Sequence, residues 1–140
     1  MKLKSLLIAD DQLGIRLLLS EVFKREGYKI FLAANGIEAI QIVKDEQPDC
    51  ILLDMEMPGM NGDEVLKKIK SDPVFKIIPV IMISGNAFPY EINESYRLGV
   101  NSFILKPSTH ELTLKVISTF MDYWLRFVEL PDVSMLKHAN

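Results

Sequence analysis

The sequence predicts an α/β domain in which helices cover both faces of a five-stranded parallel sheet. Two observations carry this prediction. Short apolar runs of strand length alternate with segments whose apolar residues recur at helical spacing. The apolar runs are also unbroken by polar residues, as strands buried on both faces require. With right-handed crossovers, five such units are expected to form a doubly wound sheet in the order 2-1-3-4-5.

The expected strands are five apolar runs, each ended by polar or small residues. They cover residues 6–9, 30–33, 50–53, 80–83 and 103–105. The segments between them carry helix signals. Apolar residues repeat at helical spacing over 15–23 and stop before Gly27, and again over 37–43, with Asn35 as the expected N-cap and Pro48 beyond the end. Two further helices are expected around 65–69 and 91–98.

The last expected helix is unusually long. It begins at a possible capping box, with Ser108 at the cap and Glu111 at the third helical position. Apolar residues then follow helical spacing from Leu112 to Val128, and Leu130-Pro131 closes the segment. The extra length either packs against the first helix or forms a two-fold dimer interface, and the pattern leaves both open.

Size and composition favour one globular domain. The chain has 140 residues, 49% hydrophobic and 25% charged, with a net charge of −3. That charge argues against a nucleic-acid-binding surface. The single cysteine, Cys50, is expected in a buried strand, and no signal peptide or membrane-spanning run is apparent. We therefore expect a cytoplasmic protein with one domain over 1–130 and a short tail over 131–140.

Polar residues directly follow four of the expected strands. Asp10 and Asp11 follow the first, Asp54 the third, Ser84 the fourth and Lys106 the fifth. In this fold ligands bind at the carboxyl ends of the strands, beside the point where strand order reverses. Taken singly, each residue fits a helix cap, a turn or a solvated surface position. Together at one sheet edge they predict a site.

The predicted site needs a cation, because three neighbouring carboxylates do not all ionise without one. Mg²⁺ is the expected ion, since it takes hard oxygen ligands and is held by one or two carboxylates plus a phosphate. A carboxylate beside Mg²⁺ is a competent nucleophile toward phosphorus. Lys106 and Ser84 would then stabilise charge on the transferring oxygens.

These motifs resemble the response regulator receiver family of two-component systems. The acidic pair Asp10-Asp11, the segment 52–62 around Asp54 and the pair Lys106-Pro107 carry the resemblance, which covers about residues 4–120. The first half is especially similar to single-domain receivers of sporulation phosphorelays, and the C-terminal end to phytochrome-associated receivers. The resemblance implies a flavodoxin-like (βα)5 fold.

The resemblance also implies a role for each site residue. Asp54 would be the phosphoacceptor and would bind Mg²⁺ together with Asp11 and the backbone carbonyl of Glu56. Asp10 would act through metal-bound water. Lys106 would pair with Asp54 or its phosphoryl group, and the bond between Lys106 and Pro107 is expected to be cis.

Two positions are implied to switch on phosphorylation. Ser84 would turn toward the phosphoryl group, and Phe103 would fill the space that it leaves; as an alternative, Phe103 is a plain core aromatic. Glu56 and Asn86 lie two residues beyond Asp54 and Ser84. We predict that they tune the lifetime of the phosphoryl group.

The expected function is that of a phosphoacceptor that catalyses only its own phosphorylation and dephosphorylation. The expected partners are a histidine kinase or a histidine phosphotransferase, which the first helix and the loop after Pro107 would dock, and a second copy bound through the last helix. Two other readings compete with this one. A degenerate receiver would serve only as a dimerising scaffold, and a phosphohydrolase with an Asp nucleophile would want a second Asp where Glu56 stands.

Overall fold

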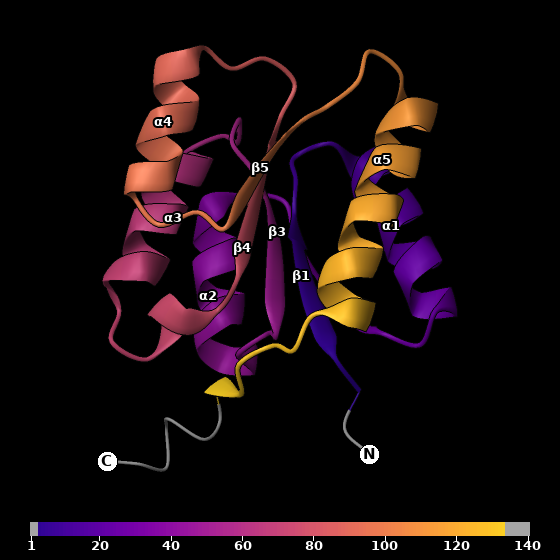
Figure 1. Ribbon diagram of the computed structural model, residues 1–140, viewed down its shortest axis with the longest axis horizontal. Helices are drawn as coiled ribbons and strands as arrows, with labels where there is room; N and C mark the ends of the chain where they lie inside the picture. The colour runs from indigo at the N-terminus through magenta and orange to yellow at the C-terminus, as the bar shows by residue number, and fades with distance from the viewer. Residues whose placement is uncertain (1–2, 134–140) are drawn as a thin grey trace.

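The central sheet has five parallel strands in the order β2-β1-β3-β4-β5. The computed structural model describes residues 3–133. The strands are β1 (Ser5–Ala9), β2 (Lys29–Ala33), β3 (Cys50–Asp54), β4 (Val80–Ser84) and β5 (Ser102–Leu105). The predicted fold class and strand order are confirmed (Figure 1).

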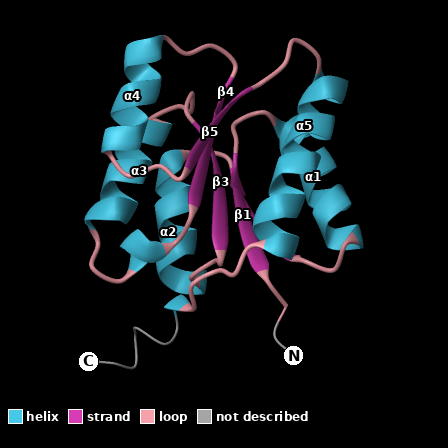
Figure 2. Cartoon of the chain, viewed as in Figure 1, coloured by secondary structure: helices cyan, strands magenta, loops and turns pink. Residues whose placement is uncertain are grey.

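Helices cover both faces of this sheet. They are α1 (Leu13–Arg25), α2 (Gly36–Glu46), α3 (Gly62–Ser71), α4 (Pro89–Arg97) and α5 (His110–Asp122), with a short 3-10 turn η1 (Phe75–Ile77) and a π-helical turn η2 (Tyr123–Phe127). Figure 2 shows α1 and α5 on one face and α2, α3 and α4 on the other.

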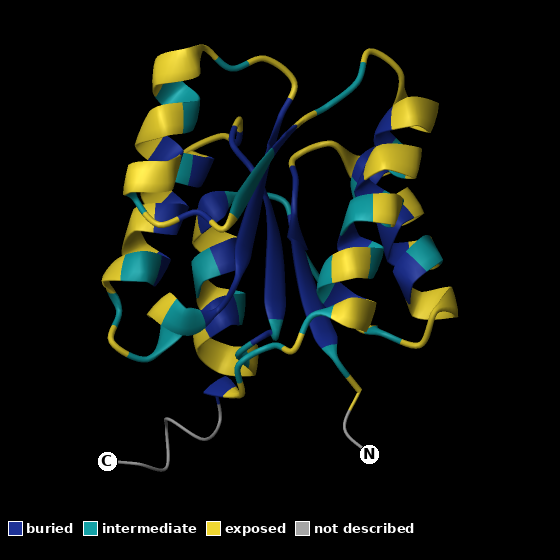
Figure 3. Cartoon of the chain, viewed as in Figure 1, coloured by how far each residue is buried: buried dark blue, intermediate teal, exposed yellow. Residues whose placement is uncertain are grey.

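The core forms two clusters, one on each face of the sheet. Along β1, Leu6 and Ile8 belong to the cluster under α1 and α5, whereas Leu7 and Ala9 belong to the cluster under α2 and α3. This is the two-residue alternation of a strand with both faces covered. β1, β3 and β4 are buried along their whole length (Figure 3). Each fully buried Leu or Ile contributes roughly 1.5–3 kcal/mol of transfer free energy.

Two helix boundaries follow the sequence signals and one does not. The Asn35 side chain accepts a hydrogen bond from the Glu38 backbone N–H, and Gly27 has a φ of 90° after α1, as expected of a helix stop. The predicted cap at Ser108 is wrong. Thr109 caps α5 by accepting from the backbone N–H of Leu112. With that start Glu111 lies at the second helical position, so the spacing of a capping box is not met.

The expected cis bond between Lys106 and Pro107 is also wrong, because no peptide bond among the described residues is cis. The trans form is the ordinary preference of an X-Pro bond, by about 0.5–1 kcal/mol. The Lys106 ammonium reaches its carboxylate partners from a trans bond, so the pairing does not require the cis form.

The last helix continues through η2 to Phe127, which accounts for the long apolar pattern. Trp124, the only tryptophan, lies on η2 with its ring edge-on to Tyr123, and its indole N–H has no hydrogen-bond partner among the described residues. The chain then crosses the lower edge of the sheet (Figure 1), and Val133, 3% exposed, joins the cluster under α2 and α3. The rest of the predicted tail, residues 134–140, lies outside the described residues.

Candidate functional site

The neighbouring strands β1 and β3 bring two buried carboxylates together at their carboxyl ends. Asp10 follows β1 and is 0% exposed, and Asp54 ends β3 and is 1% exposed. Asp11 is exposed at the rim. One carboxylate oxygen from each of the three lies within 4.8 Å of the others. The structure therefore places the three predicted acidic residues in one cluster.

The start of α1 fixes the orientation of Asp10. Its Oδ1 accepts from the backbone N–H of Gln12 at 2.8 Å, and its backbone carbonyl accepts from the Arg16 guanidinium at 2.5 Å. Arg16 was not among the predicted site residues. The sequence did contain a signal for this contact. Arg16 lies in the first turn of the helix that follows the acidic pair, and helical side chains lean toward the N-terminus of their helix, here toward that pair.

Lys106 comes from the end of β5 and bridges the two buried carboxylates. Its Nζ lies 3.0 Å from Asp10 Oδ2 and 3.3 Å from Asp54 Oδ2, and its side chain is 11% exposed. The contact with Asp54 was expected. The shorter contact with Asp10 was not, and it makes Lys106 the shared counter-ion of both acids.

One ammonium does not balance the negative charge of this cluster. Burial and the neighbouring Asp10 raise the pKa of Asp54 to about 8, although Lys106 pulls it down. Burial opposes the charge on Lys106, but Asp54 and Asp10 outweigh it and raise the pKa of the ammonium above its usual range. The cluster thus retains an excess of negative charge.

The donor atoms suit a hard divalent cation. Asp11 accepts no hydrogen bond within the part of the chain that the structure describes, and Asp54 lies beside it. The backbone N–H of Glu56 donates to Asp54 Oδ1 at 3.1 Å, which folds the loop after β3 against the cluster. Oxygen ligands from carboxylates are those that Mg²⁺ prefers, so the residues present fit the expected ion.

Ser84 faces Glu56 and is not hydrogen-bonded to Asp54 in the described structure. Its fully buried hydroxyl donates to the Glu56 carboxylate and lies 3.0 Å from the Asn86 carbonyl oxygen. It also accepts from the Asn86 backbone N–H at 3.2 Å. Glu56 and Asn86 were each predicted to tune the site; Glu56 through its side chain and Asn86 through its backbone both hydrogen-bond to Ser84.

Phe103 lies away from the carboxylates. It pairs in register with Met82 and packs, partly buried, against the core cluster on the side of α2, α3 and α4. Ser84 lies opposite Leu105, two residues further along β5. Phe103 and Ser84 therefore lie on neighbouring strands, offset by two residues in register.

A pocket of about 280 Å³ opens beside Lys106. It is lined by the start of α1, by the residue after β4, by the loop after β5 and by the first turn of α5: Gln12, Ile15, Gly85, Lys106, Pro107, Ser108, His110 and Thr113. The first helix and the loop after Pro107, which were expected to dock a partner, both contribute to this lining.

Comparison with known proteins gives consistent matches. The family model described as "Response regulator receiver domain" matches residues 6–118. The chain is 47% identical over 104 residues to sporulation initiation phosphotransferase F of Bacillus subtilis, covering 74% of this chain and 82% of that protein. It is 36% identical over 109 residues to chemotaxis protein CheY1 of Helicobacter pylori, covering 76% and 88%.

Solved structures agree with these matches. The phosphorylated cyanobacterial phytochrome response regulator RcpA superposes with a TM-score of 0.87 at 28% identity, covering 94% of this chain and 100% of that one. The Mn²⁺-bound form of response regulator Rcp1 gives 0.85 at 28% identity, covering 92% and 99%. Among the described residues, no helix is both long and apolar enough to cross a membrane.

Proposed function

The chain belongs to the response regulator receiver family of two-component signalling, and we propose that it accepts a phosphoryl group on Asp54 in a Mg²⁺-dependent reaction. The observation that carries the proposal is the buried Asp54 with Lys106 Nζ at 3.3 Å and the Asp10 and Asp11 carboxylates beside it. Receivers of this kind partner with histidine kinases or phosphotransferases, and we propose one of these as the donor.

The transfer assigns a role to each residue of the cluster. A carboxylate oxygen of Asp54 forms the new bond to phosphorus while the bond to the donor's imidazole nitrogen breaks, and that nitrogen keeps the electron pair and takes up a proton. Lys106 stabilises the charge on the transferring oxygens. Bound Mg²⁺ would add charge neutralisation, held by Asp11, Asp54 and the Glu56 carbonyl, with Asp10 acting through water.

The neighbouring cluster then sets how long the phosphoryl group lasts and how it is read. We propose that Ser84 leaves Glu56 and donates to the phosphoryl oxygens, which carry roughly −1.5 to −2 charge units. Phe103 would repack into the space that Ser84 leaves. Glu56 and Asn86 would tune hydrolysis, which is tested by the dephosphorylation rates of Glu56→Ala and Asn86→Ala; two unchanged rates would argue against it.

The decisive experiment is phosphorylation by a small-molecule donor. Purified protein is incubated with Mg²⁺ and acetyl phosphate, and intact-mass spectrometry counts added phosphoryl groups. Wild type should gain one acid-labile group, and it should gain none when a chelator removes Mg²⁺ before the donor is added. Asp54→Asn should gain none, and Asp45→Asn on exposed α2 should behave as wild type. If wild type gained no phosphoryl group, the alternative hypothesis of a degenerate receiver that serves only as a dimerising scaffold would be favoured.

A second proposal is a homodimer through α5 and η2. One face of this helix packs on α1 through buried residues such as Ile117 and Met121. The other face leaves four apolar side chains exposed: Leu112 (48%), Val116 (39%), Tyr123 (56%) and Phe127 (70%). An exposed apolar stripe of this kind is typical of an interface.

The dimer is tested by analytical ultracentrifugation with and without phosphodonor. Tyr123→Ser/Phe127→Ser should give a monomer, whereas Tyr96→Ser, which removes a half-exposed aromatic from α4, should not change the mass. A wild-type protein that is monomeric in both states at high concentration would contradict the proposal.

A further inference from the structure

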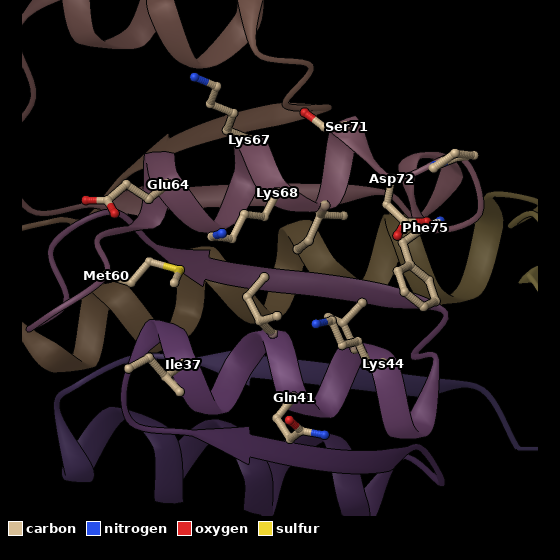
Figure 4. A pocket seen from close by; sticks show the side chains of 14 residues that line it. Ile37, Gln41, Lys44, Met60, Glu64, Lys67, Lys68, Ser71, Asp72 and Phe75 are labelled. Carbon is tan, nitrogen blue, oxygen red and sulfur yellow. Dashed lines mark hydrogen bonds between the residues drawn. The ribbon is translucent and has the colours of Figure 1, made fainter.

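A groove runs between α2 and α3, outside the cluster that holds Asp54. Its volume is about 830 Å³, and it is lined by residues of both helices, by Met60 before α3 and by the turn at Phe75 (Figure 4). The described residues leave it open, and nothing in the proposed phosphorylation chemistry uses it.

The groove has an apolar base. Ile40, Met60 and Phe75 are partly buried along it, and Ile37 is 68% exposed at one end. A single exposed apolar residue is ordinary on a protein surface. Here the apolar side chains line one common groove, and an apolar concave surface is typical of a docking site.

Two lysines face each other across this base. Lys44 projects from α2 and Lys68 from α3, and Figure 4 shows both side chains directed over the groove. Neither forms an ion pair within the described part of the chain. Of the two acidic residues in the lining, Asp72 is used internally, since it accepts from the backbone N–H groups of Val74 and Phe75. The lining as a whole carries Lys44, Lys67 and Lys68 against Glu64 and Asp72, so its net charge is positive.

The groove is also preformed. If Gly36 carried a Cβ, that atom would lie 2.3 Å from the backbone oxygen of Met60, so the start of α2 is packed directly onto the loop before α3. The Asn61 side chain caps α3 by accepting from the Glu64 backbone N–H. Binding of a ligand to such a site costs little free energy for ordering the protein.

We propose that this groove docks an amphipathic helix of a partner protein, with apolar side chains at i and i+4 and a Glu or Asp between them on the same face. The apolar residues would rest on Ile40 and Met60, and the carboxylate would lie between Lys44 and Lys68. The lining runs along residues 37–44 of α2 and 64–71 of α3, so these helices border the groove over about 12 Å, which matches about two turns of a docked helix.

The test uses a synthetic helical peptide with this pattern and a matched peptide in which each Glu is Lys. Both are titrated into labelled, unphosphorylated, Mg²⁺-free protein, and side-chain methyl NMR follows Ile37, Ile40 and Met60. The acidic peptide should shift these signals and bind at least tenfold more tightly than the basic one. Because phosphorylation is absent, the result does not depend on the function of Asp54.

Charge reversal provides the matched controls. Lys44→Glu/Lys68→Glu should weaken the acidic peptide at least tenfold and bind the basic peptide more tightly than wild type does. Lys24→Glu on α1 should change neither affinity. If the charge-reversed protein does not fold, Lys44→Gln/Lys68→Gln is used in its place, because this variant removes the positive charges without adding negative ones. Its loss of affinity for the acidic peptide should be intermediate. The proposal would be overturned if both peptides bound equally well or if the NMR shifts were confined to α1 and α5. It would also be overturned if the methyl signals shifted with protein concentration in the absence of peptide, because the occupant would then be a second copy of the chain.

Discussion

The Ser84 hydroxyl donates a hydrogen bond to the Glu56 carboxylate. Ser84 is 0% exposed, whereas Glu56 is exposed. In the described structure the hydroxyl makes no hydrogen bond to Asp54, and we propose that it turns to the phosphoryl group when that more negative acceptor is present. We propose that Glu56 acts on the site in two ways: through its contact with Ser84 and through its own negative charge near an anionic reactant.

Glu56→Gln should therefore accelerate phosphorylation by acetyl phosphate. A like charge a few ångströms from the reacting group in a water-exposed position costs about 1 kcal/mol, which corresponds to roughly fivefold in rate. Stopped-flow or quenched mass spectrometry measures the rate, with Glu64→Gln on α3 as the control. Equal rates for both variants and wild type would show that the Glu56 charge does not act on the reaction.

A second prediction concerns Lys70, which is remote from the acidic cluster. Its ammonium donates to the backbone carbonyls of Lys76 and Ile78, at 2.9 and 2.7 Å, and to the Asn101 side chain. Burial lowers the pKa of Lys70 from 10.5 to about 8. In the unfolded chain Lys70 keeps its proton up to a pH of about 10.5. Between pH 8 and 10.5 the unfolded chain therefore binds more protons than the folded protein. The free energy of unfolding should rise with pH in this window.

Ionisation of Cys50 limits, at its upper end, the pH range in which stability rises. Burial raises the pKa of its thiol from 9.0 to about 12, so the unfolded chain loses that proton first and stability falls as pH rises above 9. Urea unfolding between pH 8 and 9 measures the free energy of unfolding. In wild type this free energy should rise by at most about 1.4 kcal/mol per pH unit relative to Lys70→Met. Lys67→Met is the control. Parallel pH profiles of wild type and Lys70→Met would refute the assignment.

Among the secondary-structure elements, α2 depends on a glycine for its packing. A Cβ on Gly36 would lie 2.3 Å from the Met60 backbone oxygen, whereas one on Gly14 in α1 would meet nothing within 4 Å. Gly36→Ala should therefore destabilise the protein by roughly 1–3 kcal/mol through overpacking. Gly14→Ala should stabilise it by up to about 1 kcal/mol. Urea unfolding compares the two; a neutral Gly36→Ala would mean that the loop before α3 yields freely.

Elements were predictable from the sequence where burial alone decides them. Unbroken apolar runs identified β1, β3 and β4 because these strands are covered on both faces. The cap of α5 was misplaced by one residue because Ser108 and Thr109 offer the same hydroxyl, and only backbone geometry selects between them. The contact of Val133 with the far side of the sheet has no local signal, since it depends on where the chain travels after η2.

At the scale of the whole molecule, the site links the ends of β1, β3 and β5. Asp10, Asp54 and Lys106 belong to these three ends, so an ion bound there should stabilise the entire fold. Mg²⁺ at a hundred times its Kd should add about 2.7 kcal/mol and raise the melting temperature by several degrees. Calorimetry should show this rise in wild type, a much smaller rise in Asp11→Asn and the full rise in Asp45→Asn. An equal rise in Asp11→Asn would place the ion elsewhere.

The site as a whole was predictable because topology alone gathers the strand ends. Parallel strands carry Asp10, Asp54 and Lys106 to one edge whatever their separation in sequence. The bridge from Lys106 to Asp10 and the bond from Ser84 to Glu56 were not predictable, because they depend on side-chain rotamers. The trans bond before Pro107 likewise follows from the local path of one loop.

Trp124 gives this protein an internal optical reporter. It is the only tryptophan, it lies on η2 beside the exposed Tyr123 and Phe127, and its indole N–H has no partner among the described residues. The emission of the whole chain under tryptophan-selective excitation therefore comes from one turn at the end of the last helix. Unlabelled protein can be followed at micromolar concentration, and a change in emission wavelength on adding phosphodonor would locate its effect at that turn.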